Sequence, residues 1–220
     1  MFLHKYYIKY YIFVYVIVLT ERVTIMIPGE ITLLLAIKLH SGQMRWNNEE
    51  PYVNHSIRVA NAVFMMTKDY RLYQAALLHD AVEDTDLTLV ELATTHNCPP
   101  AVVDMVDLLT KRDGESRTDY LQRLKDSGDR GVALIKMLDS FDNAMQTPSA
   151  IEYLKANDRD PEKTRNKYIF TLYDYGPTVT FHLNNLFTYF ETLEKLGPQE
   201  PKYDLMIDMI RAGVSDKDLV

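Results

Sequence analysis

The segment from His79 to Asp84 combines an imidazole with three carboxylates and reads His-Asp-Ala-Val-Glu-Asp. It directly follows the apolar run Ala75–Leu78, which we expect to be buried in a helix. Burying such groups is unfavourable unless they are paired or bind a metal. If the helix continues through the segment, Glu83 lies one turn beyond His79 on the same face. The segment by itself favours a metal site beside carboxylates and a solvated acidic helix end equally.

Two further segments carry candidate ligands. His55 lies early in an expected helix whose same face is apolar, so its ring should point partly inward. Asp139 and Asn143 are four residues apart and share one face of another expected helix, which is rich in apolar residues. An Asp inside a buried helix needs a partner, and a metal would supply one.

Two His and two Asp residues from three helices would form a mixed nitrogen–oxygen site. Such a set suits manganese, iron or zinc better than copper(I). A metal there would lower the pKa of bound water and polarise a phosphoryl oxygen. Glu83 and Asp84 would then orient that water and move its proton. The candidate ligands are His55, His79, Asp80 and Asp139. Together these residues predict a metal-dependent hydrolase.

The elements that must position these residues are nearly all predicted to be helices, because apolar residues recur at helical spacing. Asp69, Asp129 and Asp160-Pro161 are typical helix starts, and Thr88 with Glu91 forms a capping box. The expected helices cover about 30–40, 51–68, 69–78, 88–98, 100–109, 116–128, 129–147, 160–176, 178–196 and 203–212.

The fold class predicted from this pattern is all-α, a helical bundle of about ten helices around one core. Outside the first residues there is no sustained alternation, no βαβ rhythm and no Gly-rich phosphate loop. A chain of 220 residues is long enough for one full domain.

The first 26 residues form an apolar leader, 1–26, that differs in composition from the rest. Its uninterrupted apolar part, Tyr10–Leu19, is about half the ~20 residues that a membrane span requires, so we expect no stable span. Two lysines before it would fit a signal peptide, but no Ala-x-Ala-like site follows. A third interpretation makes Met26 the natural start. We favour a non-essential leader followed by one globular domain over 27–220.

Composition narrows the partners and the compartment. The net charge of −7 argues against broad binding to nucleic acid, although it allows a local basic pocket for a small phosphorylated ligand. Cys98 is the only cysteine, so no internal disulfide can form and a reducing, cytoplasmic compartment is expected.

The order of these motifs resembles the HD-domain metal-dependent phosphohydrolases. The match is closer to the hydrolase domain of the RelA/SpoT family, especially its stand-alone small alarmone hydrolases. The resemblance covers about residues 30–145 and rests most on the pattern His-Asp-x-x-Glu-Asp-Thr. The motifs are His40–Arg45, Pro51–His55, Ala75–Thr85, Thr110-Lys111 and Lys136–Asn143.

The resemblance implies an HD-type hydrolase domain over 27–220 that removes the 3′-pyrophosphate from guanosine tetra- or pentaphosphate, (p)ppGpp. The products would be GDP or GTP and pyrophosphate, and the cofactor would be Mn²⁺ or another divalent transition metal. Carried over by position, the resemblance implies that the metal ligands are His55, His79, Asp80 and Asp139. It implies that Glu83 and Asp84 act on the attacking water, and that Arg45 and Asn143 contact the nucleotide.

Three departures from the family pattern affect the substrate side. The segment Trp46–Glu50 replaces the usual residues after Arg45, Ser140 stands where the family has Arg, and Ser56 stands in place of Pro. Two alternatives therefore stay open: an HD phosphohydrolase acting on another phosphorylated nucleotide, and a non-catalytic nucleotide- or alarmone-binding module. Residues 150–220 would complete the bundle and close the pocket. Tyr168, Tyr173 and Tyr175 are candidates to line that pocket, although we expect them mainly to pack in the core.

Overall fold

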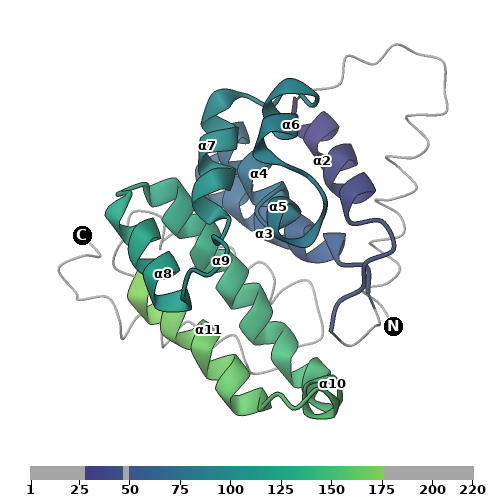
Figure 1. The fold of residues 1–220 in the computed structure, drawn as a ribbon, viewed down its shortest axis with the longest axis vertical. Coiled ribbons are helices and arrows are strands. Elements are labelled where there is room, and N and C mark those ends of the chain that lie inside the picture. The colour runs from purple at the N-terminus through teal and green to yellow at the C-terminus, as the bar shows by residue number, and fades with distance from the viewer. Residues whose placement is uncertain (1–27, 47–49, 176–220) are drawn as a thin grey trace.

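The computed structural model describes residues 28–46 and 50–175 (Figure 1). Every regular element in these ranges is a helix, and the one β contact is an isolated antiparallel bridge between Met44 and Pro51. The all-α fold class is thereby confirmed. The leader 1–26 and the helices predicted over 178–196 and 203–212 lie outside the described residues.

The helices begin and end close to where the sequence pattern places them. In chain order they are α2 Pro28–Leu39, α3 Val53–Thr67, α4 Tyr70–Leu77, α5 Ala81–Asp84, α6 Leu89–Thr94, α7 Pro100–Leu109, α8 Arg117–Asp126, α9 Arg130–Gln146, the 3-10 turn η1 Thr147–Ala150, α10 Ile151–Ala156 and α11 Pro161–Tyr175.

Side-chain caps fix most of the predicted helix starts. The Asp69 carboxylate accepts from the N–H of Arg71 at the start of α4, and Asp129 accepts from two N–H groups at the start of α9. Thr88 and Glu91 form the predicted reciprocal capping box of α6. Each cap satisfies backbone donors that the first helical turn leaves unpaired.

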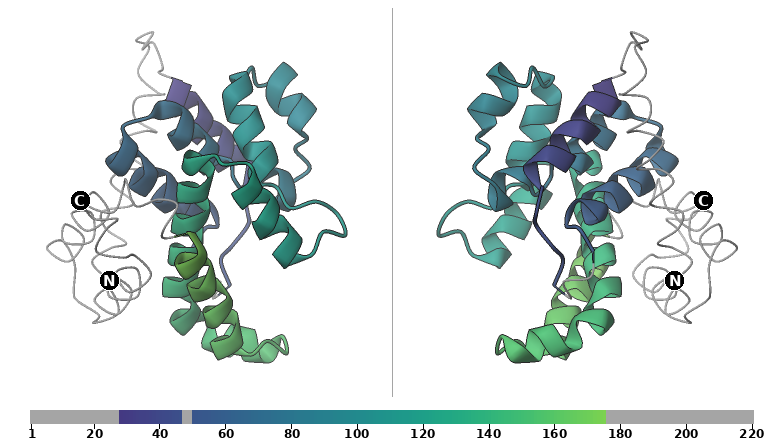
Figure 2. Two further views of the ribbon diagram at one scale, coloured as in Figure 1. Left: turned by 90° about the vertical axis from the view of Figure 1, so that its left-hand side faces the viewer. Right: turned by 90° about the vertical axis from the view of Figure 1, so that its right-hand side faces the viewer.

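The core lies between α3, α4 and α9, and α11 packs along α9 (Figures 1 and 2). Helix α9 is buried on most of its surface, including Leu134, Ile135 and Leu138. Leu77 and Leu78 at the end of α4 are 0% exposed. Because the chemistry-bearing residues follow these apolar stretches directly, they are carried into the centre of the domain.

The helix before the His-Asp doublet does not continue through it. Helix α4 ends at Leu77, and the short α5 begins only at Ala81. The Nδ1 of His79 lies 2.7 Å from the Ala76 carbonyl, which in a continuing helix would accept from the N–H of Asp80. The condition under which Glu83 would stack one turn above His79 is therefore not met.

Helix α10 is an element that the sequence pattern did not predict. It follows α9 through η1 and has no side-chain cap at Ala150, although Leu154 is fully buried. With six residues and no capping signal, it is stabilised by tertiary packing more than by local preference. Within the described residues, no helix is both long and apolar enough to cross a bilayer.

We expect Asp129→Ala to lower the free energy of unfolding by about 1 kcal/mol, because two N–H groups of α9 lose their acceptor. Asp129→Asn should retain most of the stability, since Asn caps as well as Asp. Chemical denaturation measures both. Equal losses in the two variants would contradict a capping role.

Candidate metal centre and active site

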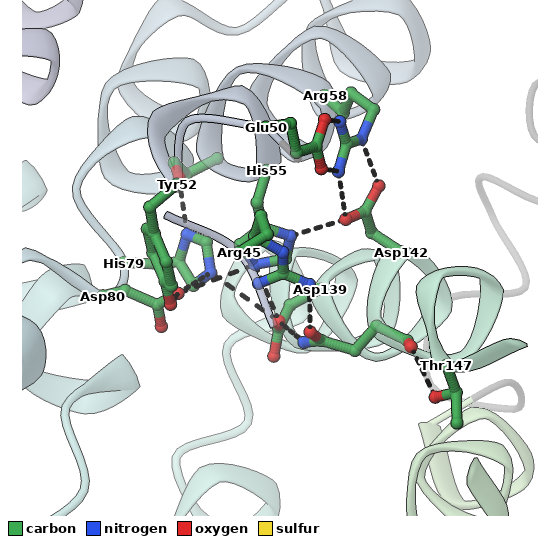
Figure 3. A network of polar contacts seen from close by, with 12 residues as sticks. Arg45, Glu50, Tyr52, His55, Arg58, His79, Asp80, Asp139, Asp142 and Thr147 are labelled. Carbon is green, nitrogen blue, oxygen red and sulfur yellow. Dashed lines mark hydrogen bonds and ion pairs between the residues drawn. The ribbon is translucent and has the colours of Figure 1, made fainter. Parts of the chain in front are cut away.

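The structure brings the four predicted metal ligands together from three places in the fold (Figure 3). His55 comes from α3, His79 and Asp80 from the turn between α4 and α5, and Asp139 from α9. The Nε2 atom of His55 lies 3.6 Å from Asp80 Oδ2 and 3.2 Å from Asp139 Oδ1. The Nε2 atom of His79 lies 3.1 Å and 3.7 Å from the same two oxygens.

Each imidazole is held from behind through its Nδ1 atom. His79 Nδ1 donates to the Ala76 carbonyl and His55 Nδ1 to Asp142 Oδ2, both at 2.7 Å. A carbonyl only accepts, so Nδ1 of His79 carries its proton and the neutral ring has its lone pair at Nε2. Both rings therefore turn their Nε2 atoms toward the carboxylates.

The burial and the missing hydrogen bonds of the two Nε2 atoms within the described part of the chain are consistent with a metal site. Both are buried and neither has a hydrogen-bond partner among the described residues. An unsatisfied buried polar atom is unfavourable by about 1–3 kcal/mol. One ligand atom each from His55, His79 and Asp80 lies within 4.8 Å of the others. A divalent cation fits this set of nitrogen and oxygen donors.

Asp139 contacts both imidazoles but is also held by neighbours on its own helix. Its Oδ2 lies 2.7 Å from Lys136 Nζ, and its Oδ1 accepts from Asn143 Nδ2 at 2.5 Å. Each carboxylate oxygen has two lone pairs, so these contacts leave capacity for a metal. Burial opposes ionisation, but Lys136 and the two imidazoles hold the pKa of Asp139 well below its usual range.

The charges at the centre favour a cation. Burial acts against an imidazolium, yet Asp80 and Asp139 hold the pKa of His79 well above its ordinary value. Burial likewise opposes ionisation of Asp80, but His79 beside it keeps the pKa of that carboxyl low. The Tyr52 hydroxyl donates to Asp80 Oδ2 at 2.6 Å. Burial and the Asp80 charge raise the pKa of Tyr52 far above its usual value, so the phenol stays a neutral donor.

Glu83 and Asp84 lie on α5, immediately after the centre. The Glu83 carboxylate accepts from the backbone N–H of Lys111 at 2.5 Å, and Gln43 Nε2 donates to the Asp84 carbonyl at 2.7 Å. Partial burial, with the negative charge of Asp80, raises the pKa of both Glu83 and Asp84. Carboxyl groups with raised pKa values near a reaction centre suit proton transfer.

Arg45 and Asn143 bond to each other beside the candidate ligands, and Asn143 also donates to Asp139. Arg45 is 4% exposed, and its Nη2 donates to Asn143 Oδ1 at 2.8 Å. Its guanidinium carbon lies 5.0 Å from the ring centroid of Trp46 and 5.4 Å from that of Tyr52. No carboxylate in the described part of the chain pairs with Arg45, and its buried Nε lacks a partner there. A bound anion would compensate this cation.

Trp46 and Tyr168 stack on each other with ring centroids 6.0 Å apart. Tyr168 is 9% exposed and Tyr175 is 0% exposed, and both belong to the hydrophobic core. Tyr168 and Tyr175 therefore pack in the core, as expected, whereas the side chain of Tyr173 lies outside the described part of the structure. Trp46 joins Tyr168 to the segment that carries Arg45.

The sequence pattern did not assign roles to Tyr52, Lys136, Asp142 or Arg58. Lys136 and Asp142 stand three residues before and after Asp139, a spacing that places them near it on α9. That spacing is the one local signal that could have found them. Tyr52 and Arg58 reach the centre through packing of α3 and the segment before it.

Comparison with known proteins agrees with this geometry. The HD-domain family model matches residues 32–154. The chain is 30% identical over 192 residues to a guanosine-3′,5′-bis(diphosphate) 3′-pyrophosphohydrolase of Vibrio cholerae, an alignment that covers 82% of this chain and 25% of that protein. The bifunctional (p)ppGpp synthase/hydrolase SpoT of Escherichia coli gives the same identity and coverage. This chain thus spans about a quarter of the length of these relatives.

A solved structure shares the fold. It is described as a metazoan ortholog of SpoT that hydrolyses ppGpp, and it superposes with a TM-score of 0.54 at 22% identity. The match covers 90% of this chain and 99% of that one. At this identity the likeness establishes the fold alone. The family match over more than half of the sequence shows that the chain belongs to the HD-domain family.

Proposed function

We propose that this chain is a metal-dependent hydrolase that removes the 3′-pyrophosphate of (p)ppGpp. The observation that carries the proposal is the pair of buried imidazoles whose Nε2 atoms, without hydrogen-bond partners among the described residues, face Asp80 and Asp139. The relatives named for this activity support the substrate class. The single half-buried cysteine, Cys98, fits a reducing cytoplasmic setting.

The proposed ion is Mn²⁺, held by His55, His79, Asp80 and Asp139. Imidazole and carboxylate donors suit such a cation, and other divalent transition metals share this preference. When bound, the ion supplies Lewis-acid chemistry that makes water more acidic and polarises a phosphoryl oxygen. Tyr52 orients Asp80 by donating to its Oδ2, which keeps that carboxylate turned toward the imidazoles.

Glu83 and Asp84 move protons in the proposed reaction. Hydrolysis joins the water oxygen to phosphorus and breaks the bond to the 3′ oxygen, which takes up a proton. A carboxylate beside the centre accepts the proton from water, and its raised pKa improves it as a base at neutral pH. The Lys111 N–H fixes the position of the Glu83 carboxylate. Two such carboxyl groups favour an enzyme over a non-catalytic binding module.

Arg45 holds the nucleotide in this proposal. Its guanidinium already lies against Trp46 and Tyr52, and a planar cation of this kind stacks on a base and also pairs with phosphate. Asn143 fixes the guanidinium from behind and links it to Asp139. The nucleotide is therefore placed by the same helix that supplies a proposed metal ligand.

A second candidate function is hydrolysis of another phosphorylated nucleotide by the same centre. The observation that favours it is Ser140, which is 0% exposed and offers no cation where the resemblance led us to expect Arg. Purified protein with Mn²⁺ should convert ppGpp to GDP and pyrophosphate. Turnover of another nucleotide in a panel, with none of ppGpp, would establish the second candidate instead.

We expect His79→Ala to abolish stoichiometric binding of Mn²⁺, because one of two imidazole donors is lost. His96→Ala is the matched control, since His96 lies outside the ligand cluster and should leave the metal content unchanged. Metal analysis after dialysis gives the stoichiometry. A full complement of metal in His79→Ala would refute the proposed centre.

Glu83→Gln should lower kcat by about 10²–10⁴-fold while leaving the metal content intact, because it removes a proton acceptor and no ligand. Glu152→Gln, on the exposed face of α10, should behave as wild type. Steady-state kinetics with ppGpp and metal analysis on the same preparations separate the two effects. An unchanged kcat would exclude Glu83 from proton transfer.

Arg45→Lys should raise KM for ppGpp by about tenfold or more with a smaller effect on kcat, since Lys keeps the charge and loses the stacking plane. Arg71→Lys serves as a control, because Arg71 is exposed and pairs with Asp69 away from the centre. A fall in kcat alone would place Arg45 in the chemical step.

A further inference from the structure

A chain of charged side chains lies behind His55, on the side away from the proposed metal (Figure 3). Asp142 Oδ2 accepts from His55 Nδ1 at 2.7 Å. Arg58 donates two hydrogen bonds to the same carboxylate, from Nε to Oδ1 at 2.6 Å and from Nη2 to Oδ2 at 2.9 Å. The other side of Arg58 meets the Glu50 carboxylate at 2.9 Å and 3.0 Å.

The paired contacts determine the orientation of Asp142. Two parallel bonds from a planar guanidinium fix both the position and the plane of a carboxylate. Glu50 in turn fixes Arg58, so its guanidinium is held on both sides. With its carboxylate fixed in this way, Asp142 places an acceptor opposite His55 Nδ1 and keeps the proton on that nitrogen.

The two imidazoles are held differently, and this difference points to a role. His79 donates to a neutral backbone carbonyl, whereas His55 donates to a carboxylate. Both kinds of partner fix the tautomer and the orientation of an imidazole ligand, and the carboxylate also places a negative charge behind the ring. The His55 side chain is 0% exposed, so water does not substitute for this partner.

We propose that Asp142 is a positioning residue that fixes the tautomer of His55 and strengthens it as a metal ligand, and that Arg58 and Glu50 hold Asp142 in place. The inference rests on the metal centre of the proposed function. Glu50 also contacts the residue proposed to bind the nucleotide, because its backbone carbonyl accepts from the backbone N–H of Arg45 at 2.9 Å. The proposed metal ligand His55 and the proposed nucleotide contact Arg45 are thus both supported by Glu50.

The first test is metal affinity, measured on the full chain by competition between Mn²⁺ or Zn²⁺ and a chelator. Asp142→Asn should weaken binding by about 10–100-fold. The substitution removes the negative charge behind His55 and replaces one acceptor by an amide donor, which then faces either Arg58 Nε or the pair His55 Nδ1 and Arg58 Nη2. Glu50→Gln should also weaken metal binding, but by a smaller factor, because Glu50 contacts Arg58 and not Asp142 itself.

The matched control is Glu115→Gln, which breaks another pairing of a carboxylate with an arginine. Glu115 pairs with Arg123 at 2.8 Å and lies outside the ligand cluster. Unfolding of each metal-free variant shows how much stability it loses. Glu115→Gln should lose stability without a change in metal affinity. If Asp142 had a purely structural role, Asp142→Asn would also lose stability and keep its metal affinity.

The second test reads the tautomer directly through the ¹⁵N shifts of the imidazoles in the metal-free protein. In wild type the His55 signals should show a protonated Nδ1, and Asp142→Leu, which leaves Nδ1 without an acceptor, should move the proton to Nε2. Unchanged shifts together with an affinity within twofold of wild type would overturn the inference. The tautomer also separates the proposals, because a wild type that binds no metal refutes the metal centre while the shifts still test Asp142.

Discussion

The contacts at the Nδ1 atoms of His55 and His79 determine the arrangement of the whole centre. Each ring gives its Nδ1 proton to an acceptor behind it, one to the Ala76 carbonyl and the other to Asp142. The Nε2 lone pairs are therefore directed into one space bounded by carboxylates. Helix α4 ends at Leu77, and in the turn that follows the His79 side chain donates to the Ala76 carbonyl. The break in the helix and the bond that orients His79 thus lie at the same place in the chain.

Helix α9 organises the other side of the centre. Within two turns it carries Lys136, Asp139, Asp142 and Asn143, which contact in order a proposed ligand, the two imidazoles, the back of His55 and the guanidinium of Arg45. The burial of so many polar groups is tolerated because each is paired with a charge of opposite sign or a donor. A shift of α9 along its axis would disturb all of these contacts together, which makes the Asp129 cap at its start relevant to the site.

Much of this architecture is visible in the sequence. The helix starts at Asp69, Thr88 and Asp129 follow from caps that act within three residues, and their positions agree with the structure. The candidate ligands could be selected by residue type, since His and Asp next to apolar runs are rarely left unpaired. The short α10 was missed because it has no cap and six residues give too little periodicity.

The sequence by itself determined the helical class, most helix boundaries and the residue types available for metal and proton chemistry, because caps and periodicity act over a few neighbouring residues. Only the tertiary structure decided which of these residues meet. Asp142 and His55 are 87 residues apart, and Arg45 and Asn143 are 98 apart, so their contacts depend on how α3, α9 and the segment around Arg45 pack. The break after Leu77 likewise coincides with a side-chain bond to a backbone carbonyl, which helical periodicity does not encode.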